Sequence, residues 1–219
     1  MILPNIKIKT TNASYNVIIG NNIVSNLSKI LLYNSIKFNK CLIVIDNKVP
    51  IKLLNLKKKF INKNKLIFFF NSNEKNKNQN SINKLLNILL KNNFHRNDCL
   101  ISIGGGITGD ISAFAASIFK RGIKFVNIPT TLLAQVDSSI GGKTGINTKY
   151  GKNLIGTFCQ PSLVISDTQF LNSLNRRQVI CGYAEILKHS LIMDKKFFLW
   201  LCNNAKKIIN EKDKNLLNN

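Results

Sequence analysis

Apolar and polar residues follow regular spacings along the N-terminal part of the chain, and the spacing changes from segment to segment. Alternation over Ile6 to Thr10 and over Tyr15 to Ile19 predicts two paired strands with a turn at residues 12–14. Helical spacing predicts a helix from Asn22 to Tyr33. The continuous apolar run from Cys41 to Ile45 is typical of a buried parallel strand.

Two further helix and strand units follow. The first is predicted as a helix from Ile51 to Phe60 and a strand from Leu66 to Phe70. The second is predicted as a helix from Ser81 to Asn92 and a strand from Cys99 to Ile103. Repeated units of this length favour an open, mostly parallel α/β sheet with right-handed crossovers.

The composition changes after Ile103, and most of the chain's 12 glycines lie between there and Gly156. A glycine-rich segment inside an α/β domain usually brings the backbone close to a ligand. Beyond Asp167 the spacing becomes helical, over Thr168 to Leu174, Arg176 to Met193 and Lys195 to Asn210. We expect an α/β domain over residues 1–166 and the beginning of an all-helical second domain over residues 167–219.

The formal net charge of the 219 residues is +22, and 44% of them are apolar, which is enough for one sizeable core. A positive charge attracts polyanions when the basic residues cluster. Here the lysines are scattered among asparagines and isoleucines, without the interleaved aromatic residues of single-strand binders. A compositional bias of the kind that AT-rich coding produces explains the charge better than a nucleic-acid partner, so no such partner is expected.

The 5 cysteines form no CxxC pair and no zinc-ribbon spacing, which favours a reducing compartment. The N-terminus lacks the charged and apolar regions of a signal peptide. No stretch reaches the roughly 18 apolar residues that a membrane span needs. We therefore expect a cytoplasmic protein without a membrane partner.

A glycine turn between a strand and a helix is the strongest local signal. Gly104 to Asp110 separates the predicted strand from a predicted helix over Ile111 to Phe119. Such a turn presents free N–H groups and the positive end of a helix dipole, which suits a pyrophosphate. It differs from the usual dinucleotide fingerprint because it follows a later strand and has adjacent glycines. The alternative is a tight turn in which Asp110 serves as a local cap.

Longer segments around this turn resemble the 3-dehydroquinate synthase family. The resemblance is dense from Gly104 to about Met193 and is carried by Arg121–Asn147, Gly151–Gly156, Gln160–Pro161 and Gly182–His189. The related glycerol and iron-dependent alcohol dehydrogenases share the glycine turn but lack the SSIGGKTG and GKN segments. The resemblance implies a carbon–oxygen lyase of the shikimate pathway, which makes 3-dehydroquinate and phosphate from 3-deoxy-arabino-heptulosonate 7-phosphate. The implied reaction is an internal redox cycle that uses bound NAD.

For the phosphorylated substrate, the resemblance implies contacts from cationic and amide side chains. Lys143, Asn153 and Arg121 are implied to bind its phosphate. Arg121 is implied to reach in from a neighbouring subunit, since the family is expected to be homodimeric. Asp137 is implied to hold hydroxyl groups near the site of hydride transfer, with a helix cap as its alternative role. Lys188 is implied to be a substrate-binding cation.

For NAD, the resemblance implies residues from several segments. The family has a glycine before the implied glutamate, whereas this chain has Asn73, which tolerates the left-handed backbone. The implied cofactor residues are Asp46, Glu74, Lys77, Gly106, Ile107, Thr108, Gly109, Asp110, Thr130, Thr131, Lys143, Lys152, Phe170, Leu171, Asn172 and Ser173.

The family's metal site, for zinc or cobalt, resembles one glutamate plus two histidines, both downstream of the glutamate. Glu185 is the implied ligand here, and without the resemblance it would be a surface pair with Lys188. Of the chain's 2 histidines, His95 is expected at the surface and His189 in a packing role. About two-fifths of a family member is expected to be absent. This would be explained if the chain is a fragment, a truncated product, or one piece of a split protein that a separate chain completes. In each case the chain should bind the cofactor better than it turns over substrate.

Two alternatives stay open at the level of sequence. One is an NAD-dependent polyol or glycerol dehydrogenase of the same superfamily, which would accumulate NADH with a simple polyol. The other is a non-catalytic basic relative, which would bind nucleic acid with a strong salt dependence and have no affinity for NAD.

Overall fold

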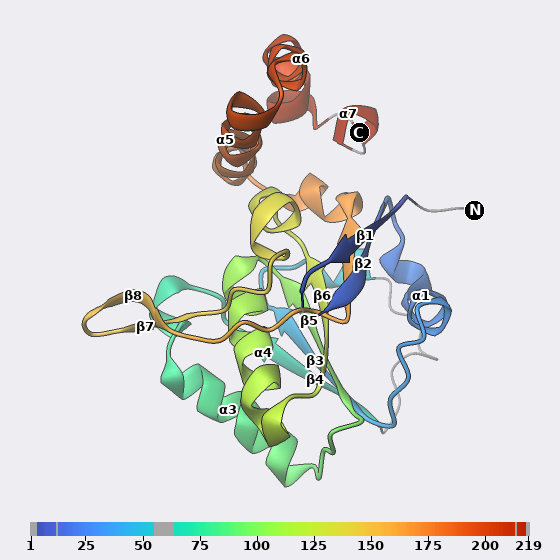
Figure 1. The fold of residues 1–219 in the computed structure, drawn as a ribbon, viewed down its shortest axis with the longest axis vertical. Helices are drawn as coiled ribbons and strands as arrows, with labels where there is room; N and C mark the ends of the chain where they lie inside the picture. The colour runs from blue at the N-terminus through green and yellow to red at the C-terminus, as the bar shows by residue number, and fades with distance from the viewer. Residues whose placement is uncertain (1–3, 12, 55–63, 213, 218–219) are drawn as a thin grey trace.

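A seven-stranded sheet forms the centre of the computed structural model, which describes residues 4–11, 13–54, 64–212 and 214–217 (Figure 1). The strand order is β1-β2-β9-β6-β5-β3-β4. β1 pairs with β2 in antiparallel fashion, and every other pair in this sheet is parallel, which confirms the predicted open, mostly parallel sheet. Its strands are β1 Asn5–Lys9, β2 Ser14–Gly20, β3 Cys41–Asp46, β4 Lys65–Phe70, β5 Cys99–Gly104, β6 Lys124–Pro129 and β9 Leu163–Asp167.

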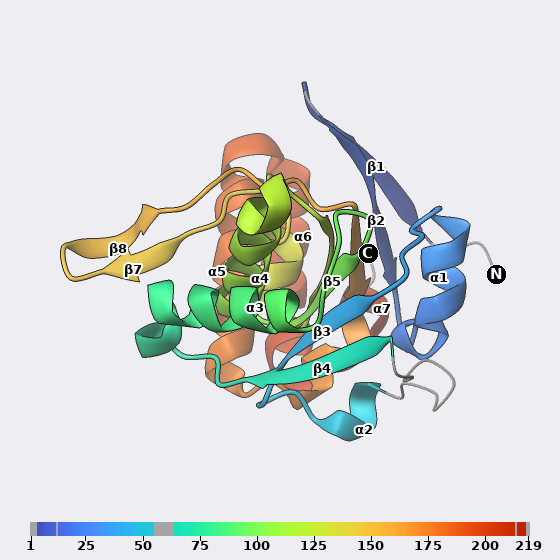
Figure 2. The same cartoon turned by 90° about the horizontal axis from the view of Figure 1, so that it is seen from below.

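Helices cover both faces of the sheet (Figure 2). On β3, alternate side chains point to opposite faces, as in any strand. Ile43 and Ile45 pack with α1 Leu27–Tyr33, whereas Leu42 and Val44 pack with α3 Gln79–Lys91 and α4 Gly106–Ile118. Both faces of β3 are therefore buried, which explains why the strand is apolar at nearly every position.

A two-stranded antiparallel hairpin projects from the side of the sheet (Figure 1). It consists of β7 Ile146–Thr148 and β8 Gly151–Ile155. Most of β8 is exposed on both faces, so its sequence carries no apolar alternation. The hairpin, β6 and β9 were not among the predicted strands.

The helices at the end of the chain gather above the carboxyl ends of the strands (Figure 1). α5 Arg176–Met193 has the predicted bounds, and Asn175 closes a capping box with Gln178 at its start. A separate apolar cluster, which includes Leu132, Leu174, Tyr183 and Leu201, joins α5 to α6 Lys195–Lys206 and to the segment before the π-helix η4 Ala134–Ser138. The remaining elements are α7 Lys214–Leu217, the 3-10 helices η1 Val24–Asn26, η2 Glu74–Asn76, η3 Phe119–Arg121 and η5 Thr168–Ser173, the π-helix η6 Lys207–Glu211, and the short α2 Ile51–Leu54.

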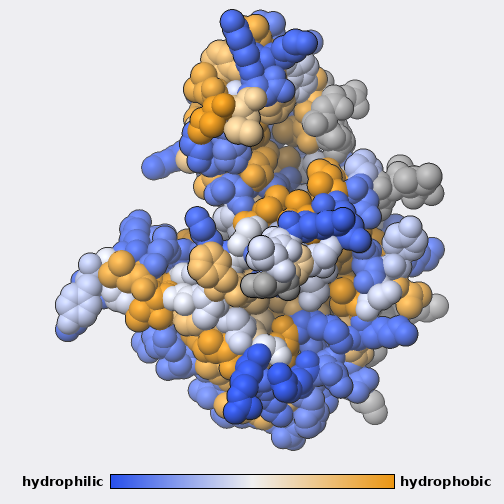
Figure 3. All heavy atoms as spheres, in the orientation of Figure 1, coloured by the Kyte–Doolittle hydropathy of each residue, from blue (hydrophilic) through white to orange (hydrophobic). Residues whose placement is uncertain are grey.

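The surface of this helical region carries apolar side chains (Figure 3). Exposed examples on α5 and α6 are Leu191, Ile192, Met193 and Leu199. No helix within the described ranges is long and apolar enough to cross a membrane. The helix predicted from Ile51 to Phe60 begins at Ile51 as expected, and its part beyond Leu54 lies in residues 55–63, outside the described ranges. Asn12 of the predicted turn between the first two strands also lies outside them.

Candidate functional site

The glycine turn joins β5 to α4, but the helix begins earlier than the sequence indicated. Gly105 is the N-cap in an extended conformation, and no side chain caps the helix there. α4 starts at Gly106, so the prediction of a helix beginning at Ile111 is wrong. Asp110 lies in the second turn, which also removes its alternative role as a cap. The N–H groups in the first turn of a helix lack helical partners, and they form the positive end of the helix dipole.

Hydroxyl side chains lie so close to this turn that only glycine fits at its start, and they bound a cradle there. A β-carbon at Gly106 would lie 2.9 Å from Ser138 Oγ, and one at Gly105 would lie 3.1 Å from Thr131 Cγ2. The buried hydroxyl of Thr108 has no hydrogen-bond partner among the described residues. Free N–H groups, an unpartnered hydroxyl and absent β-carbons fit a pyrophosphate that approaches the backbone closely.

Lys77 connects three segments beside this cradle. Its Nζ lies 2.5 Å from Asp110 Oδ2 and donates to Asn153 Oδ1 at 2.6 Å. The Lys77 side chain is buried, and only 17% of the Asp110 side chain is exposed. Burial raises the pKa of Asp110, although the hydrogen bond and charge of Lys77 oppose the shift. One lysine thus holds the loop after β4, the start of α4 and the hairpin together.

The loop after β4 holds a second, exposed pair. Lys152 Nζ lies 3.2 Å from Glu74 Oε1, and Asn147 Nδ2 donates to the same oxygen at 3.0 Å. These hydrogen bonds, that of Asn147 first, lower the pKa of Glu74. Asn73 has φ −153° and accepts from Asn76 N, so it is extended and caps η2. Asn73 therefore does not use the left-handed backbone that asparagine tolerates, because its side chain acts as a cap.

A cavity of about 520 Å³ opens between α4, η4 and the hairpin. It collects four of the predicted site residues: Asp110, Asp137, Lys143 and Asn153. Sequence reasoning did not single out Ser138, Ile140, Thr144, Gly145, Leu154, Gly156, Thr157 and Phe158, which also line it. Several of these belong to the SSIGGKTG segment, so the motif already contained the signal. A cation in the lining suits an anionic group, and carboxylates and hydroxyl side chains suit hydroxyl groups, so the cavity fits a small polyhydroxylated molecule that carries an anionic group.

The other predicted residues do not line this cavity, and they differ in burial. Thr130 is buried, and its N–H donates to Gly104 O at 2.9 Å. Phe170 and Leu171 are buried in separate apolar clusters, whereas Asn172 and Ser173 are exposed. Arg121, Lys152 and Lys188 are exposed and do not line the cavity. Ile107 and Gly109 lie in the first turns of α4.

Asp46 ends β3 beside the glycine turn, and Lys48 N donates to its Oδ1 at 3.0 Å. Burial raises the pKa of Asp46 above the ordinary value for an aspartate, while hydrogen bonding and charge from Lys48 oppose the shift. A raised pKa contributes stability below the ordinary value, and this stability is lost as the pH rises through the raised value.

We therefore expect Asp46→Asn to stabilise the fold at neutral pH, because the amide removes a charge that burial disfavours. The gain should vanish in acid well below the ordinary pKa of an aspartate, where Asp46 is protonated in both the folded and the unfolded state. Urea unfolding of Asp46→Asn and of the unaltered chain, from acid to neutral pH, measures the gain in stability. An equal advantage at both ends of the range would contradict the expectation.

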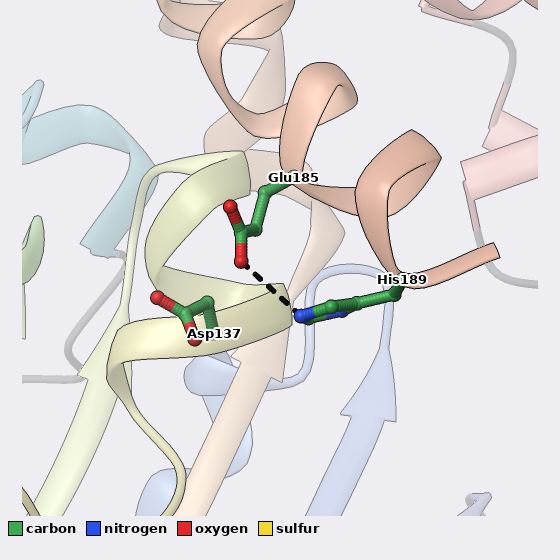
Figure 4. Close-up of side chains that lie close together, drawn as sticks. All are labelled: Asp137, Glu185 and His189. Carbon is green, nitrogen blue, oxygen red and sulfur yellow. Dashed lines mark ion pairs between the residues drawn. The ribbon is translucent and has the colours of Figure 1, made fainter. Parts of the chain in front are cut away.

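A second cluster lies where α5 approaches η4 (Figure 4). Glu185 and His189 are one helical turn apart, and His189 Nε2 lies 3.1 Å from Glu185 Oε1. Lys188 pairs with the same oxygen, and its hydrogen bond lowers the pKa of Glu185. The ligand atoms of Asp137, Glu185 and His189 all lie within 4.8 Å of one another. His189 is 47% exposed, so its expected packing role is wrong: its ring turns toward the carboxylate.

Gly182 permits this approach. A β-carbon there would lie 2.6 Å from Leu133 N and from Leu132 Cβ, which is closer than real side chains come. The absence of a side chain at this position therefore sets the distance between α5 and the segment that carries Asp137.

These features define an α/β protein of the nucleotide-binding type: an open, mostly parallel sheet, an uncapped helix N-terminus in a glycine cradle, and a polar cavity beside it. Residues 67–181 match the family model described as 3-dehydroquinate synthase N-terminal. The chain therefore belongs to the 3-dehydroquinate synthase family.

Individual relatives agree with this assignment. The 3-dehydroquinate synthase of Pelagibacter ubique is 64% identical over 210 residues, which are 95% of this chain and 57% of the relative. The chain thus spans little more than half of that relative's length. A 2-epi-5-epi-valiolone synthase from Streptomyces hygroscopicus, solved with NAD+ and Zn2+, is 27% identical with a TM-score of 0.82 over 94% of this chain and 57% of its own. A 2-deoxy-scyllo-inosose synthase, solved with carbaglucose-6-phosphate, NAD+ and Co2+, is 26% identical with a TM-score of 0.78 over 86% and 51%.

Proposed function

We propose that this chain supplies the cofactor- and phosphate-binding part of a 3-dehydroquinate synthase, which converts 3-deoxy-arabino-heptulosonate 7-phosphate to 3-dehydroquinate and phosphate. The observation that carries the proposal is the shared cavity, where Asp110 of α4 meets Asp137, Lys143 and Asn153. One of the named relatives is a 3-dehydroquinate synthase, and the other two are synthases solved with NAD+. A cytoplasmic location belongs to the same proposal, and the five free cysteines support it.

In this proposal NAD lies along the glycine cradle. The N–H groups at the start of α4 bind its pyrophosphate, and Thr108 offers its unpartnered hydroxyl. Asp46 at the end of β3 accepts from a ribose hydroxyl, and Glu74, Lys77 and Lys152 close the loop side of the site. Thr130, Thr131 and the segment from Phe170 to Ser173 border it. When bound, NAD supplies the acceptance and return of one hydride.

The substrate takes the cavity. Lys143 and Asn153 donate to its phosphate, and Asp137 accepts from a hydroxyl of its carbon chain. Lys188 and Arg121 are exposed and do not line the cavity. Lys188 adds a cation from α5, and Arg121 reaches the phosphate of a neighbouring subunit in a homodimer. A phosphorylated polyhydroxy acid matches this mixture of cations, amide and carboxylate.

The helical region completes the proposed division of the chain. Residues 1–166 form the NAD-binding domain, and residues 167–219 begin the metal and substrate domain. The apolar cluster around Leu174 and Tyr183 is distinct from the two that cover the sheet, which supports the division, and Leu132 of the first domain packs into it where the two domains meet. Glu185 is a metal ligand in this scheme, and the bound zinc or cobalt ion supplies charge stabilisation for a substrate oxygen. A separate chain that carries the rest of a family member is the alternative source of further ligands.

A cap substitution tests the cofactor site. Gly105→Asp places a favourable N-cap residue on α4. Its carboxylate would occupy the free N–H groups and repel the pyrophosphate, because both compete for the same dipole end. We expect NAD affinity to fall by at least about tenfold, which is about 1.4 kcal/mol. Isothermal titration of NAD measures the loss.

The matched control is Asn83→Asp on the exposed face of α3, which makes the same charge change and keeps the acceptor for Gln79 Nε2. Its NAD affinity should equal that of the unaltered chain. Unchanged NAD affinity in Gly105→Asp, or no NAD binding by the unaltered chain, would refute the proposed function.

A further inference from the structure

The cluster between η4 and α5 contains three side chains with metal-ligating atoms, and two of them are not implied ligands of the family. We propose that Asp137, Glu185 and His189 together form a site for a divalent zinc-class cation within this chain. The inference rests on the proposed function for the role of Glu185, and it adds Asp137 and His189 as ligands.

The spacing of the donor atoms matches a small coordination sphere. Zinc binds nitrogen and oxygen ligands at about 2.0–2.2 Å, so two tetrahedral ligands lie about 3.3 Å apart. The separation between His189 Nε2 and Glu185 Oε1 is 3.1 Å. All three ligand atoms lie within 4.8 Å, so closing the site requires Asp137 to move by roughly 1.5 Å at most. Rotation of an exposed carboxylate can supply that movement.

The elements that carry the ligands are fixed by packing. Glu185 and His189 share one face of α5 at i, i+4 spacing. Asp137 lies on the π-helix η4, which contacts α5. Figure 4 shows the Glu185 carboxylate pointing down from α5 to the ribbon that carries Asp137, with the His189 ring beside it. Gly182, one turn before Glu185, holds the two elements at this distance.

The charges of the cluster also favour a cation. Two carboxylates face one another across the gap, and Lys188 pairs with the same Glu185 oxygen as His189. A divalent ion would replace Lys188 on the same Glu185 oxygen, and His189 would bind through its neutral imidazole. Lys188 is therefore a competitor of the ion.

The ion would lie at the wall of the cavity. Asp137 belongs to both groups: it lines the cavity and it faces Glu185 and His189. A cation held there has open coordination positions on the cavity side, since three protein ligands leave a fourth position free. A hydroxyl or carboxylate of a bound substrate can reach that position.

The chain's 2 histidines make the test direct. With nitrogen-15 in histidine alone, Zn2+ should move the imidazole signals of His189 and leave those of exposed His95 in place. The titration uses Zn2+ alone, without NAD or substrate. Signals of both histidines that stay unchanged, or that move equally, would overturn the proposal.

Variants make the test quantitative. His189→Gln and Asp137→Asn should each weaken Zn2+ binding by at least about tenfold, since even outer-shell changes cost that much. His95→Gln is the matched control and should bind Zn2+ as the unaltered chain does. Lys188→Ala should strengthen binding about threefold, because it removes the competing cation. Full affinity in His189→Gln or in Asp137→Asn refutes the three-ligand site.

Failure of this site and failure of the proposed function give different results. An NAD titration in excess EDTA reports the cofactor site alone. NAD binding without a Zn2+ response overturns only the metal site, whereas a Zn2+ response without NAD binding overturns only the proposed cofactor role.

Discussion

Replacing Gly182 by alanine should destabilise the fold by about 2 kcal/mol, although the same change inside a helix normally stabilises it by about 1 kcal/mol. The added β-carbon would lie 2.6 Å from the backbone nitrogen of Leu133. A flexible side chain could turn away from such a contact, but the backbone at Leu133 is the N-cap of η4 and can only shift together with that helix. α5 would move outward, and the cluster of Asp137 with Glu185 would open. Urea unfolding measures the change in stability. A loss of stability indicates that packing against Leu133 dominates, whereas a gain would indicate that helix propensity dominates.

Gly109→Ala is the matched control for this experiment. Gly109 is also a buried helical glycine, but a β-carbon there would meet its nearest neighbour, Asn127 Nδ2, at 3.4 Å. The alanine should therefore be neutral or stabilising by up to about 1 kcal/mol. If Gly182→Ala proved as stable as Gly109→Ala, α5 would not be packed against Leu133.

The sequence predicts most of the fold because buried elements leave a strong pattern. β3 and β5 are apolar at nearly every position since both sheet faces are covered, and α5 has a cap residue at its start. β9 ends in Ser166 and Asp167, which are buried but polar, so an apolar run does not mark it. The hairpin strand β8 is exposed on both faces, and nothing in its side chains selects a strand.

The site is less predictable because its contacts join distant segments. Lys77 and Asn153 are 76 residues apart, and only the folded sheet brings the loop after β4 beside the hairpin. The glycine turn was visible in the sequence, but the helix start was not, since glycine lowers helical propensity at the positions that α4 uses. His189 shows a third limit, because an imidazole at helical spacing from a glutamate fits packing, pairing or ligation equally well.

Lys77→Met should destabilise the fold by about 3 kcal/mol at neutral pH, because it leaves the carboxylate of Asp110 without its cation. Asp110 is largely buried, and Lys77 opposes the rise of its pKa. Without the lysine, the pKa of Asp110 rises further, and ionisation of Asp110 costs more stability as the pH increases. The defect should therefore shrink in acid, where Asp110 is protonated in the folded and unfolded chain.

Two further variants separate charge from packing. Lys77→Met combined with Asp110→Asn should regain most of the lost stability, since the pair is then replaced as a unit and no buried charge remains. Lys84→Met on the exposed face of α3 is the matched control and should change stability by less than about 0.5 kcal/mol. If the double variant were as unstable as Lys77→Met alone, the bond from Lys77 to Asn153, rather than the charge on Asp110, would dominate the contribution of Lys77.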